Sequence, residues 1–228
     1  MASRGKLLVV ATPIGNLGDL SARAASALSE SDFWIVEDTR QSAKLQSHLG
    51  IRKPMRILNE HSTFAQIAQL EQEIAEDKTA VLITDGGSPA ISDPGAILVD
   101  RCHDCGIEVD AIPGPSAVTN ALMLSGFFAQ RFAFLGFLPR KPTDMKKELA
   151  PFADSPLTLV LFESPFRAEK TLEIAAEVLG KRRYAVCREM TKAHQQVFRG
   201  RLPDTPGEAE VPRKGEWTIV VEGRRKSG

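Results

Sequence analysis

The sequence predicts an α/β protein with two α/β domains, the first built on a parallel sheet and the second on a mixed sheet. In the first half, short β-branched runs alternate with segments of helical period, as is typical of parallel strands joined by right-handed helical crossovers. In the last third, strand-like runs follow one another without full helices between them, which indicates antiparallel hairpins. With 228 residues, 43% of them apolar, the chain is long enough to bury a core without disulfides.

The first domain is expected to span residues 1–113. Continuous apolar runs predict buried strands, and apolar residues at turn spacing, such as Ile67, Leu70 and Ile74, predict helices. The expected strands are 6–11, 33–36, 56–58, 80–84 and 108–112, and the expected helices are 21–30, 41–49, 64–75 and 95–105. Because ligands of parallel α/β sheets bind outside the carboxyl ends of the strands, we expect a ligand pocket at that end.

The second domain is expected to span residues 114–228, beginning within the Pro-Gly-Pro sequence at 113–115. Serine is a favoured N-cap, proline fits the first helical turn, and glycine ends helices. The expected helices run from Ser116 to Gly126 and from Ser164-Pro165 to Gly180, and the expected strands are 131–137, 157–163, 184–188, 195–201 and 216–222.

Composition excludes several classes of protein. The longest apolar runs, such as Leu7 to Ala11, are far shorter than the roughly 20 residues that a membrane-spanning helix needs. The N-terminal residues contain no apolar signal region. An odd cysteine count of three is typical of a reducing compartment. We therefore expect a cytoplasmic protein with no membrane partner.

Cys102 and Cys105 form a C-x-x-C pair with His103 between them. A structural zinc site would need a second pair of ligands, and only Cys187 and scattered histidines remain. A redox pair should open a helix, whereas this pair closes one that Gly106 ends. We expect an ordinary helix end and no metal site.

Charge is unevenly distributed along a chain whose net charge is zero. Residues 1–130 contain 10 basic and 16 acidic residues, and residues 131–228 contain 19 basic and 13 acidic residues. Basic clusters occur at Arg140, Lys141, Lys146 and Lys147, at Lys181, Arg182 and Arg183, and at Arg224, Arg225 and Lys226. Such clusters can follow a phosphate backbone, or they can be solvated helix faces and a chain end, and both interpretations stay open.

Three loops rich in glycine and proline follow predicted strands of the first domain. They comprise residues 12–18, 85–95 and 113–116. Glycine lets a ligand approach backbone amides and carbonyls, although any one of these loops could be a simple turn. Three at the same end of one sheet indicate a ligand crevice. None carries the dinucleotide fingerprint or the P-loop lysine, which speaks against NAD binding and ATP hydrolysis.

Several segments together resemble one enzyme family. They are "VVATPIGNLGDLS", "EDTR", "NEHS", "LITDGGSPAISDPG", "PGPSAVTNAL", "FLGFLPR", "ESPFR", "REMTK" and "KGEW". In order, and over nearly the whole chain, they resemble the tetrapyrrole-methylase superfamily of S-adenosylmethionine enzymes. Within it they are most similar to the ribosomal small-subunit RNA cytidine 2′-O-methyltransferases of the I type. The family's Asp-Ala-Gly-Thr-Pro is Asp-Gly-Gly-Ser-Pro at 85–89 here, a change that keeps the loop backbone.

The resemblance implies a methyltransferase with S-adenosylmethionine in a cleft between two α/β domains. It also implies a homodimer that acts on RNA of the small ribosomal subunit. The first domain is then expected to supply the acceptor pocket, and the second domain cofactor and RNA contacts. By the same resemblance, the expected cofactor contacts are Pro13, Gly15, Gly87, Ile91, Ser116, Ala117, Phe162, Met190 and Trp217.

The chemistry of this reaction points to further residues. Methyl transfer from a sulfonium is an in-line displacement, so the protein mainly aligns the reacting groups. A base that accepts the ribose proton could add about 10²–10⁴-fold. Polar residues after the second and third strands are candidates, and we expect Asp38, Glu60 and His61 to be catalytic, although Asp38 could instead cap a helix. The expected substrate contacts are Arg40, Asn59, Arg140, Lys141, Arg167 and Lys192, of which the last two could instead bind the cofactor carboxylate.

Two other functions stay open at this point. The first is a methyltransferase that acts on a corrin-type macrocycle. Such an enzyme needs a broad apolar floor, and the chain has only 11 Phe, 2 Trp and 1 Tyr. The second is a non-catalytic protein that binds RNA or an adenosyl ligand, which would have no need of the polar residues at the strand ends.

Overall fold

The computed structural model describes residues 5–225 and divides the chain into two compact units, Met1–Ser116 and Ala117–Gly228. The division falls three residues beyond the predicted boundary, because the loop at 113–116 packs on the first unit. The Ser88 hydroxyl lies 3.4 Å from the Pro115 carbonyl oxygen, and a Cβ at Gly114 would lie 3.0 Å from that of Ala11. Lys226 of the third basic cluster lies outside the described residues.

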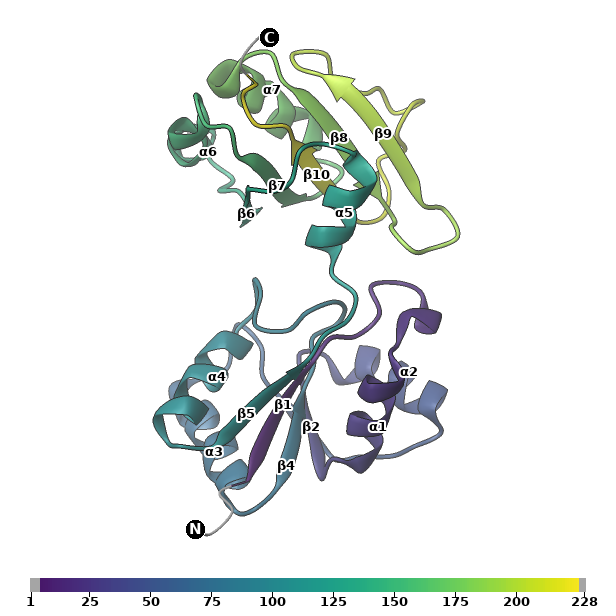
Figure 1. The fold of residues 1–228 in the computed structure, drawn as a ribbon, viewed down its shortest axis with the longest axis vertical. Helices are drawn as coiled ribbons and strands as arrows, with labels where there is room; N and C mark the ends of the chain where they lie inside the picture. Colours follow the sequence, from purple (N-terminus) through teal and green to yellow (C-terminus); the bar gives the residue numbers. More distant parts are fainter. Residues whose placement is uncertain (1–4, 226–228) are drawn as a thin grey trace. The chain divides into compact units, whose positions relative to one another are not determined.

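The first unit is a five-stranded parallel sheet with helices on both faces, as predicted (Figure 1). Its strands are β1 (Lys6–Val10), β2 (Phe33–Val36), β3 (Met55–Ile57), β4 (Thr79–Leu82) and β5 (Glu108–Ile112). Its helices are η1 (Leu17–Asp19), α1 (Ala22–Glu30), α2 (Thr39–Leu49), α3 (Phe64–Ala75) and α4 (Gly95–Asp104). The strand order is β3-β2-β4-β1-β5.

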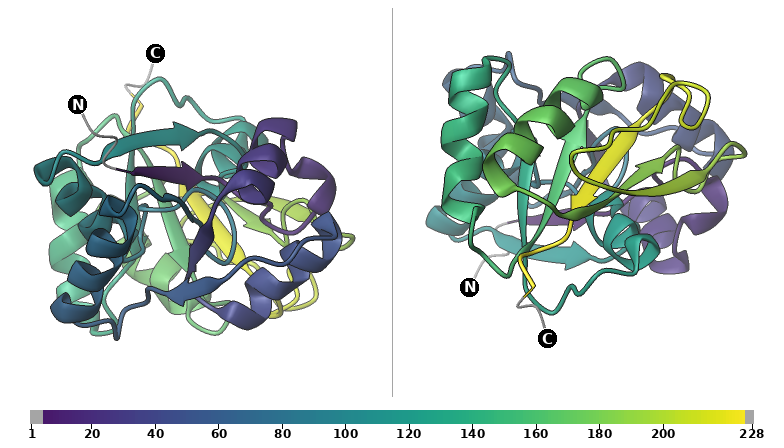
Figure 2. Two further views of the ribbon diagram at one scale, coloured as in Figure 1. Left: turned by 90° about the horizontal axis from the view of Figure 1, so that it is seen from below. Right: turned by 90° about the horizontal axis from the view of Figure 1, so that it is seen from above.

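Each face of this sheet has its own core, and β2 shows why. All four of its residues are buried, and successive side chains point to opposite faces. Phe33 and Ile35 pack with α3 and α4, whereas Trp34 and Val36 pack with α1 and α2. The left view of Figure 2 shows the two helix pairs on either side of the sheet. The Trp34 Nε1–H donates to the Leu28 carbonyl at 2.9 Å, which satisfies the one polar atom of this side chain.

The second unit is a five-stranded mixed sheet, as predicted, and its strand order is β6-β7-β10-β8-β9. Strands β6 and β7 are parallel, and the other neighbours are antiparallel. The strands are β6 (Phe132–Phe137), β7 (Thr158–Glu163), β8 (Arg183–Arg188), β9 (Gln196–Arg201) and β10 (Trp217–Val221). The helices are α5 (Ala117–Ser125), α6 (Pro142–Leu149), η2 (Ala150–Phe152) and α7 (Ala168–Leu179).

The two faces of the second sheet are covered by different helices. Buried side chains of α6 and α7, such as Leu149 and Leu172, form one core with Leu161 and Ile219 of the sheet. On the other face α5 packs on β8 and β10, where the thiol of Cys187 lies 3.8 Å from the Ala121 carbonyl. The right view of Figure 2 shows α7 in green beside β10 in yellow.

One local expectation was wrong, and one helix was not predicted. Helix α7 begins at Ala168, with Arg167 as N-cap, and not at Ser164-Pro165. The Ser164 carbonyl instead accepts the amides of Arg167 and Ala168 in a turn that precedes the helix. Helix α6 was not predicted, although Pro142 at its first position is a usual start signal. Within residues 5–225, no helix is long and apolar enough to cross a membrane.

Candidate active site

The loops after β1 and β4 are joined by backbone hydrogen bonds. The Thr12 amide donates to the Gly87 carbonyl at 2.9 Å, and the Gly87 amide donates to the Thr12 carbonyl at 3.0 Å. The loop after β5 completes the group through the contacts at Gly114 and Pro115 described above. The three glycine-rich loops therefore form one continuous surface at the carboxyl edge of the parallel sheet.

Gly87 belongs to this surface, and its backbone conformation disfavours a side chain. Its φ is 94°, which L-residues with a side chain rarely adopt. A Cβ there would lie 3.3 Å from Ile14 Cγ2. The same loop holds Ala90 and Ser92 at φ 64°. Strain of this kind is costly and is common at ligand sites.

Asp93 ties this strained loop to the start of α4. Its Oδ1 accepts the Gly95 amide at 2.7 Å, and burial raises the pKa of the carboxyl. Its Oδ2 is buried and has no hydrogen-bond partner among residues 5–225.

Polar groups at the ends of β2 and β4 are joined by hydrogen bonds into a network. The Thr84 hydroxyl donates to Glu37 at 2.9 Å, and the Asp38 amide donates to Asp85 at 3.2 Å. Although Asp85 is an exposed residue, the surrounding loops partly desolvate its carboxyl. This desolvation, followed by the nearby charge of Glu37, raises the pKa of Asp85.

The predicted catalytic residue Asp38 belongs to this network but is held as a helix cap. It is the N-cap of α2 and accepts the Arg40 amide at 2.8 Å. Its carboxylate also pairs with the Arg40 guanidinium, at 2.5 Å for the shortest contact. These bonds to Arg40 lower the pKa of Asp38 to about 2. A carboxylate with so low a pKa is a weak base.

The predicted residues Glu60 and His61 lie on the loop after β3, at the edge of the sheet. Both side chains are 84% exposed and approach each other to 3.6 Å. Asn59 shapes the same loop, because its side-chain oxygen accepts the His61 amide at 3.0 Å. Within the described part of the chain, no hydrogen bond or ion pair joins Asp38 to Glu60 or His61. The bonds of the structure therefore join Glu60 to His61, and Asp38 to Arg40 and Asp85.

The remaining first-unit residues predicted to bind the cofactor, Pro13, Gly15, Ile91 and Ser116, lie in the three joined loops. Ala117, also predicted, is the first residue of α5. Ile91 is 50% exposed despite being apolar.

The second-unit residues predicted to bind the cofactor lie near one end of its sheet. Phe162 is near the end of β7, Trp217 begins β10 and Met190 follows β8. The Phe162 ring contacts those of Phe134 and Phe137, with centroids 4.8 and 5.6 Å away. Trp217 is only 5% exposed, yet its Nε1–H has no acceptor among residues 5–225. A buried donor without a partner is costly, which makes this position a candidate ligand contact.

Two predicted substrate contacts also make bonds within the second unit. Arg167 donates to the carbonyls of Leu138 and Pro139, at 2.9 and 3.3 Å, and approaches Glu163. Lys192 pairs with Glu189 and Glu216 at 2.9 and 3.0 Å.

The other two, Arg140 and Lys141, have exposed side chains at the start of α6. No ion pair or hydrogen bond of either side chain occurs in residues 5–225.

Sequence reasoning missed Asp85 as a functional candidate, and also the Thr84–Glu37 bond beneath it. The signal was present, because Asp85 directly follows the expected strand 80–84 and Asp38 lies two residues after β2. The neighbouring glycines predicted a role for the backbone of this loop, and no role was predicted for its carboxylate.

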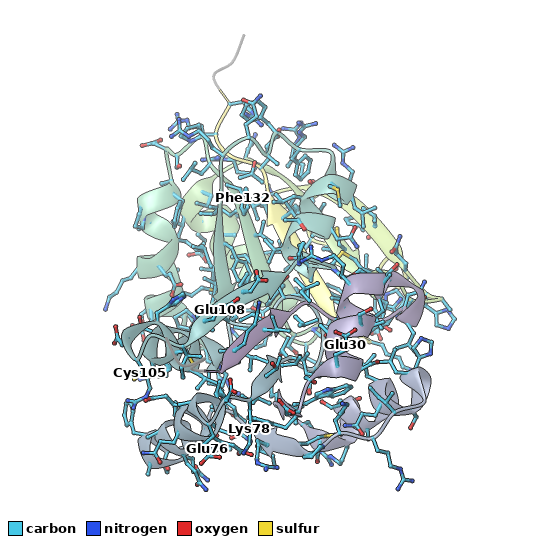
Figure 3. All side chains as sticks on the ribbon, turned by 60° about the horizontal axis from the view of Figure 1, so that its bottom comes forward. Glu30, Glu76, Lys78, Cys105, Glu108 and Phe132 are labelled. Carbon is cyan, nitrogen blue, oxygen red and sulfur yellow. The ribbon has the colours of Figure 1, made fainter. Side chains whose placement is uncertain are left out.

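The C-x-x-C pair lies at the end of α4, where Figure 3 labels Cys105. Burial raises the pKa of Cys102 to about 12. The Cys105 thiol donates to Glu71 at 2.8 Å, and Arg101 pairs with the same carboxylate. Within residues 5–225, no group of three or more side chains could hold a metal ion.

Comparison with known proteins gives consistent matches. The family model described as Tetrapyrrole (Corrin/Porphyrin) Methylases matches residues 6–206. A protein of Thermotoga maritima named Ribosomal RNA small subunit methyltransferase I is 41% identical, covering 96% of this chain and 99% of that protein. Its namesake from Mycobacterium tuberculosis is 42% identical, covering 97% of this chain and 79% of that protein.

Solved structures share the fold at lower identity. The diphthine synthase structure has a TM-score of 0.73 and 17% identity, covering 96% of this chain and 89% of that one. The structure of the methyltransferase CobJ has a TM-score of 0.71 and 16% identity, covering 98% and 97%. At these identities the likeness shows the fold alone.

Proposed function

Because the chain belongs to the tetrapyrrole (corrin/porphyrin) methylase family and is a methyltransferase, we propose that it methylates the ribose 2′-hydroxyl of a cytidine in small-subunit ribosomal RNA. The methyl donor is S-adenosylmethionine. The observation that carries the proposal is identity above 40%, over nearly the whole chain, to proteins named for methylation of this RNA.

The residues at the strand ends fit the proposed cofactor. The joined loops offer backbone amides and carbonyls, and Gly87 keeps a space that a Cβ would fill. In the second unit the Trp217 Nε1–H, which has no partner among residues 5–225, offers a buried donor. S-adenosylmethionine, when bound, supplies an electrophilic methyl group on a sulfonium. Uncharged backbone groups suit it, because a tight carboxylate pair would stabilise the sulfonium before transfer more than during it.

We assign the acceptor pocket to the ends of β2 and β4. The proton of the ribose hydroxyl needs an acceptor, and the raised pKa of Asp85 makes it a better base than Asp38. Asp38 instead orients Arg40, whose exposed guanidinium is suited to a phosphate beside the reacting ribose. Glu60, His61 and Asn59 lie on the neighbouring loop and remain proposed substrate contacts.

A tetrapyrrole substrate has weaker support. Solved structures titled as uroporphyrin-III-C-methyltransferase share the fold at only 19–20% identity. The chain also has only 11 Phe, 2 Trp and 1 Tyr for the apolar floor that a macrocycle needs. The homodimer implied by the family resemblance and the cytoplasmic location expected from composition are part of the proposal.

Transfer of tritium from labelled S-adenosylmethionine tests the proposal. Small ribosomal subunits, free ribosomal RNA and a uroporphyrin substrate would be compared, and labelled RNA would be digested to nucleosides. We expect label in 2′-O-methylcytidine from the ribosomal substrates. Label on a base, or only on the macrocycle, would refute the proposed reaction.

A further inference from the structure

A basic groove lies in the second unit, at the end of its sheet where β8 begins and β9 and β10 end. It has a volume of about 710 Å³. Segments that line it are the end of α7, the residues after η2 and the stretch after β10. Figure 1 shows these segments near the label of the C-terminus. Its charged lining residues are Lys181, Arg182, Arg183, Arg201, Arg224 and Arg225, with Asp154, Glu177 and Glu222.

The three acidic residues of the groove are already paired with cations. Asp154 pairs with Arg224, and Glu177 pairs with Lys146 of α6. Glu222 is buried and accepts both the Arg183 guanidinium, at 2.6 Å for each of two bonds, and Arg225 at 3.3 Å. These pairs lower the pKa of Glu222 and keep it ionised. The acids are therefore not available to neutralise the remaining cations.

Arg182 is a buried residue that lines the groove. Its guanidinium donates to the carbonyls of Leu179, Ala153 and Glu222. Of the two interpretations of this cluster, these bonds favour a structural role for Arg182 over a phosphate contact.

Two cations remain without partners. Lys181 and Arg201 are exposed, and neither side chain has an ion pair or hydrogen bond in residues 5–225. Arg201 stands directly opposite Arg183 in the β8–β9 pairing. Like charges opposite each other destabilise a sheet, and Glu222 compensates only Arg183. An anion in the groove would remove this cost.

The groove lies at the opposite end of the second sheet from the predicted cofactor contacts. Val221, which ends β10 beside the groove, pairs with Leu159, whereas Trp217 pairs with Glu163 at the far end. Strand β8 separates the two ends by roughly 17 Å, given about 3.3 Å per residue. A ligand in the groove therefore does not compete for Phe162, Met190 or Trp217.

We propose that this groove binds the sugar-phosphate backbone of the RNA substrate through Lys181 and Arg201, away from the methylated nucleotide. The inference rests on the proposed function for the identity of the RNA. Charge complementarity supports this inference, because the groove has two cations unpaired within residues 5–225, whereas its acidic residues are paired with other cations. Contacts of this kind position a nucleic acid without reading its sequence.

RNA binding without cofactor tests the groove. Fluorescence anisotropy would measure the affinity of a ribosomal RNA fragment over a range of salt concentrations. The double variant Lys181→Gln with Arg201→Gln should make the log–log salt slope shallower by about 1.4, at about 0.7 per lost contact. Affinity near 0.1 M salt should fall roughly tenfold or more. Both side chains are exposed, so folding should be retained.

Two control variants sharpen the test. Arg52→Gln with Lys170→Gln removes the same two charge types from exposed positions outside the groove, and it should leave the slope nearly unchanged. Lys181→Arg with Arg201→Lys keeps both charges in the groove and should keep the wild-type slope. S-adenosylmethionine affinity, measured by calorimetry, should be the same in all variants.

The outcomes separate this inference from the proposed function. If the salt slope of RNA binding is shallower in the groove variant and not in the control variants, RNA binding by the groove is supported, whether or not the RNA is methylated. Methylation by the wild type, with equal slopes in groove and control variants, would overturn the groove and leave the proposed function standing. Wild-type protein that does not bind RNA would overturn both.

Discussion

Replacing Gly87 by valine tests the link between loop geometry and cofactor binding. The backbone at Gly87 has φ 94°, and the new Cβ would meet Ile14 Cγ2 at 3.3 Å. Backbone strain of this kind costs of order 1–3 kcal/mol, and valine is β-branched, so we expect the upper part of that range. For a unit of this size the midpoint of thermal unfolding should fall by at least about 4 °C.

Gly50→Val is the matched control. Gly50 has φ 66° at the C-cap of α2, and a Cβ added there would have no heavy atom within 4 Å, so the variant carries similar backbone strain away from the loops. Calorimetry with S-adenosylmethionine and thermal unfolding would be run on both variants. We expect similar losses of stability but a loss of cofactor affinity only in Gly87→Val, by tenfold or more, which equals about 1.4 kcal/mol.

The result that would refute this reasoning is specific. If folded Gly87→Val protein bound the cofactor with the wild-type Kd, the loop after β4 would not contact it. If Gly50→Val lost affinity equally, the effect would come from general destabilisation and not from the space kept by Gly87.

Three further predictions concern the base, the acid response and assembly. Asp85→Asn should slow methyl transfer by about 10²–10⁴-fold, whereas Asp100→Asn, at an exposed position of α4, should have no effect. Because the base must be deprotonated, wild-type turnover should fall as pH drops through the raised pKa of Asp85. An unchanged pH profile in Asp85→Asn would contradict this role. Glu222 has a lowered pKa in the fold, so its stabilising contribution should be complete above the ordinary glutamate pKa of about 4.3 and lost as pH falls through the folded value. Between pH 6 and about 3, the free energy of unfolding, measured with denaturant, should therefore change less with pH in Glu222→Gln than in the wild type. Equal pH dependence in the two proteins would count against this contribution of Glu222. Light scattering at micromolar concentration should give the mass of a two-fold homodimer, and a monomer mass would exclude it.

Local patterns determined most elements of this fold. Strand β2 has the predicted bounds, Phe33–Val36, because its apolar run is itself the strand signal. Helix α3 has the predicted bounds, Phe64–Ala75, because its helical period and its N-cap Thr63 are both local sequence signals. The gathering of three loops at one edge followed as well, since parallel strands must all end on the same side.

Tertiary structure alone decided which charges are free. The sequence shows Lys181, Arg182 and Arg183 as one basic cluster, yet only folding makes Arg182 a buried donor to three carbonyls and pairs Arg183 with Glu222. In the same way, folding lowers the pKa of Asp38 through Arg40 and raises that of Asp85 through its surroundings. Composition and spacing report which groups exist, but a pKa and a free donor depend on desolvation and on partners brought from distant parts of the chain.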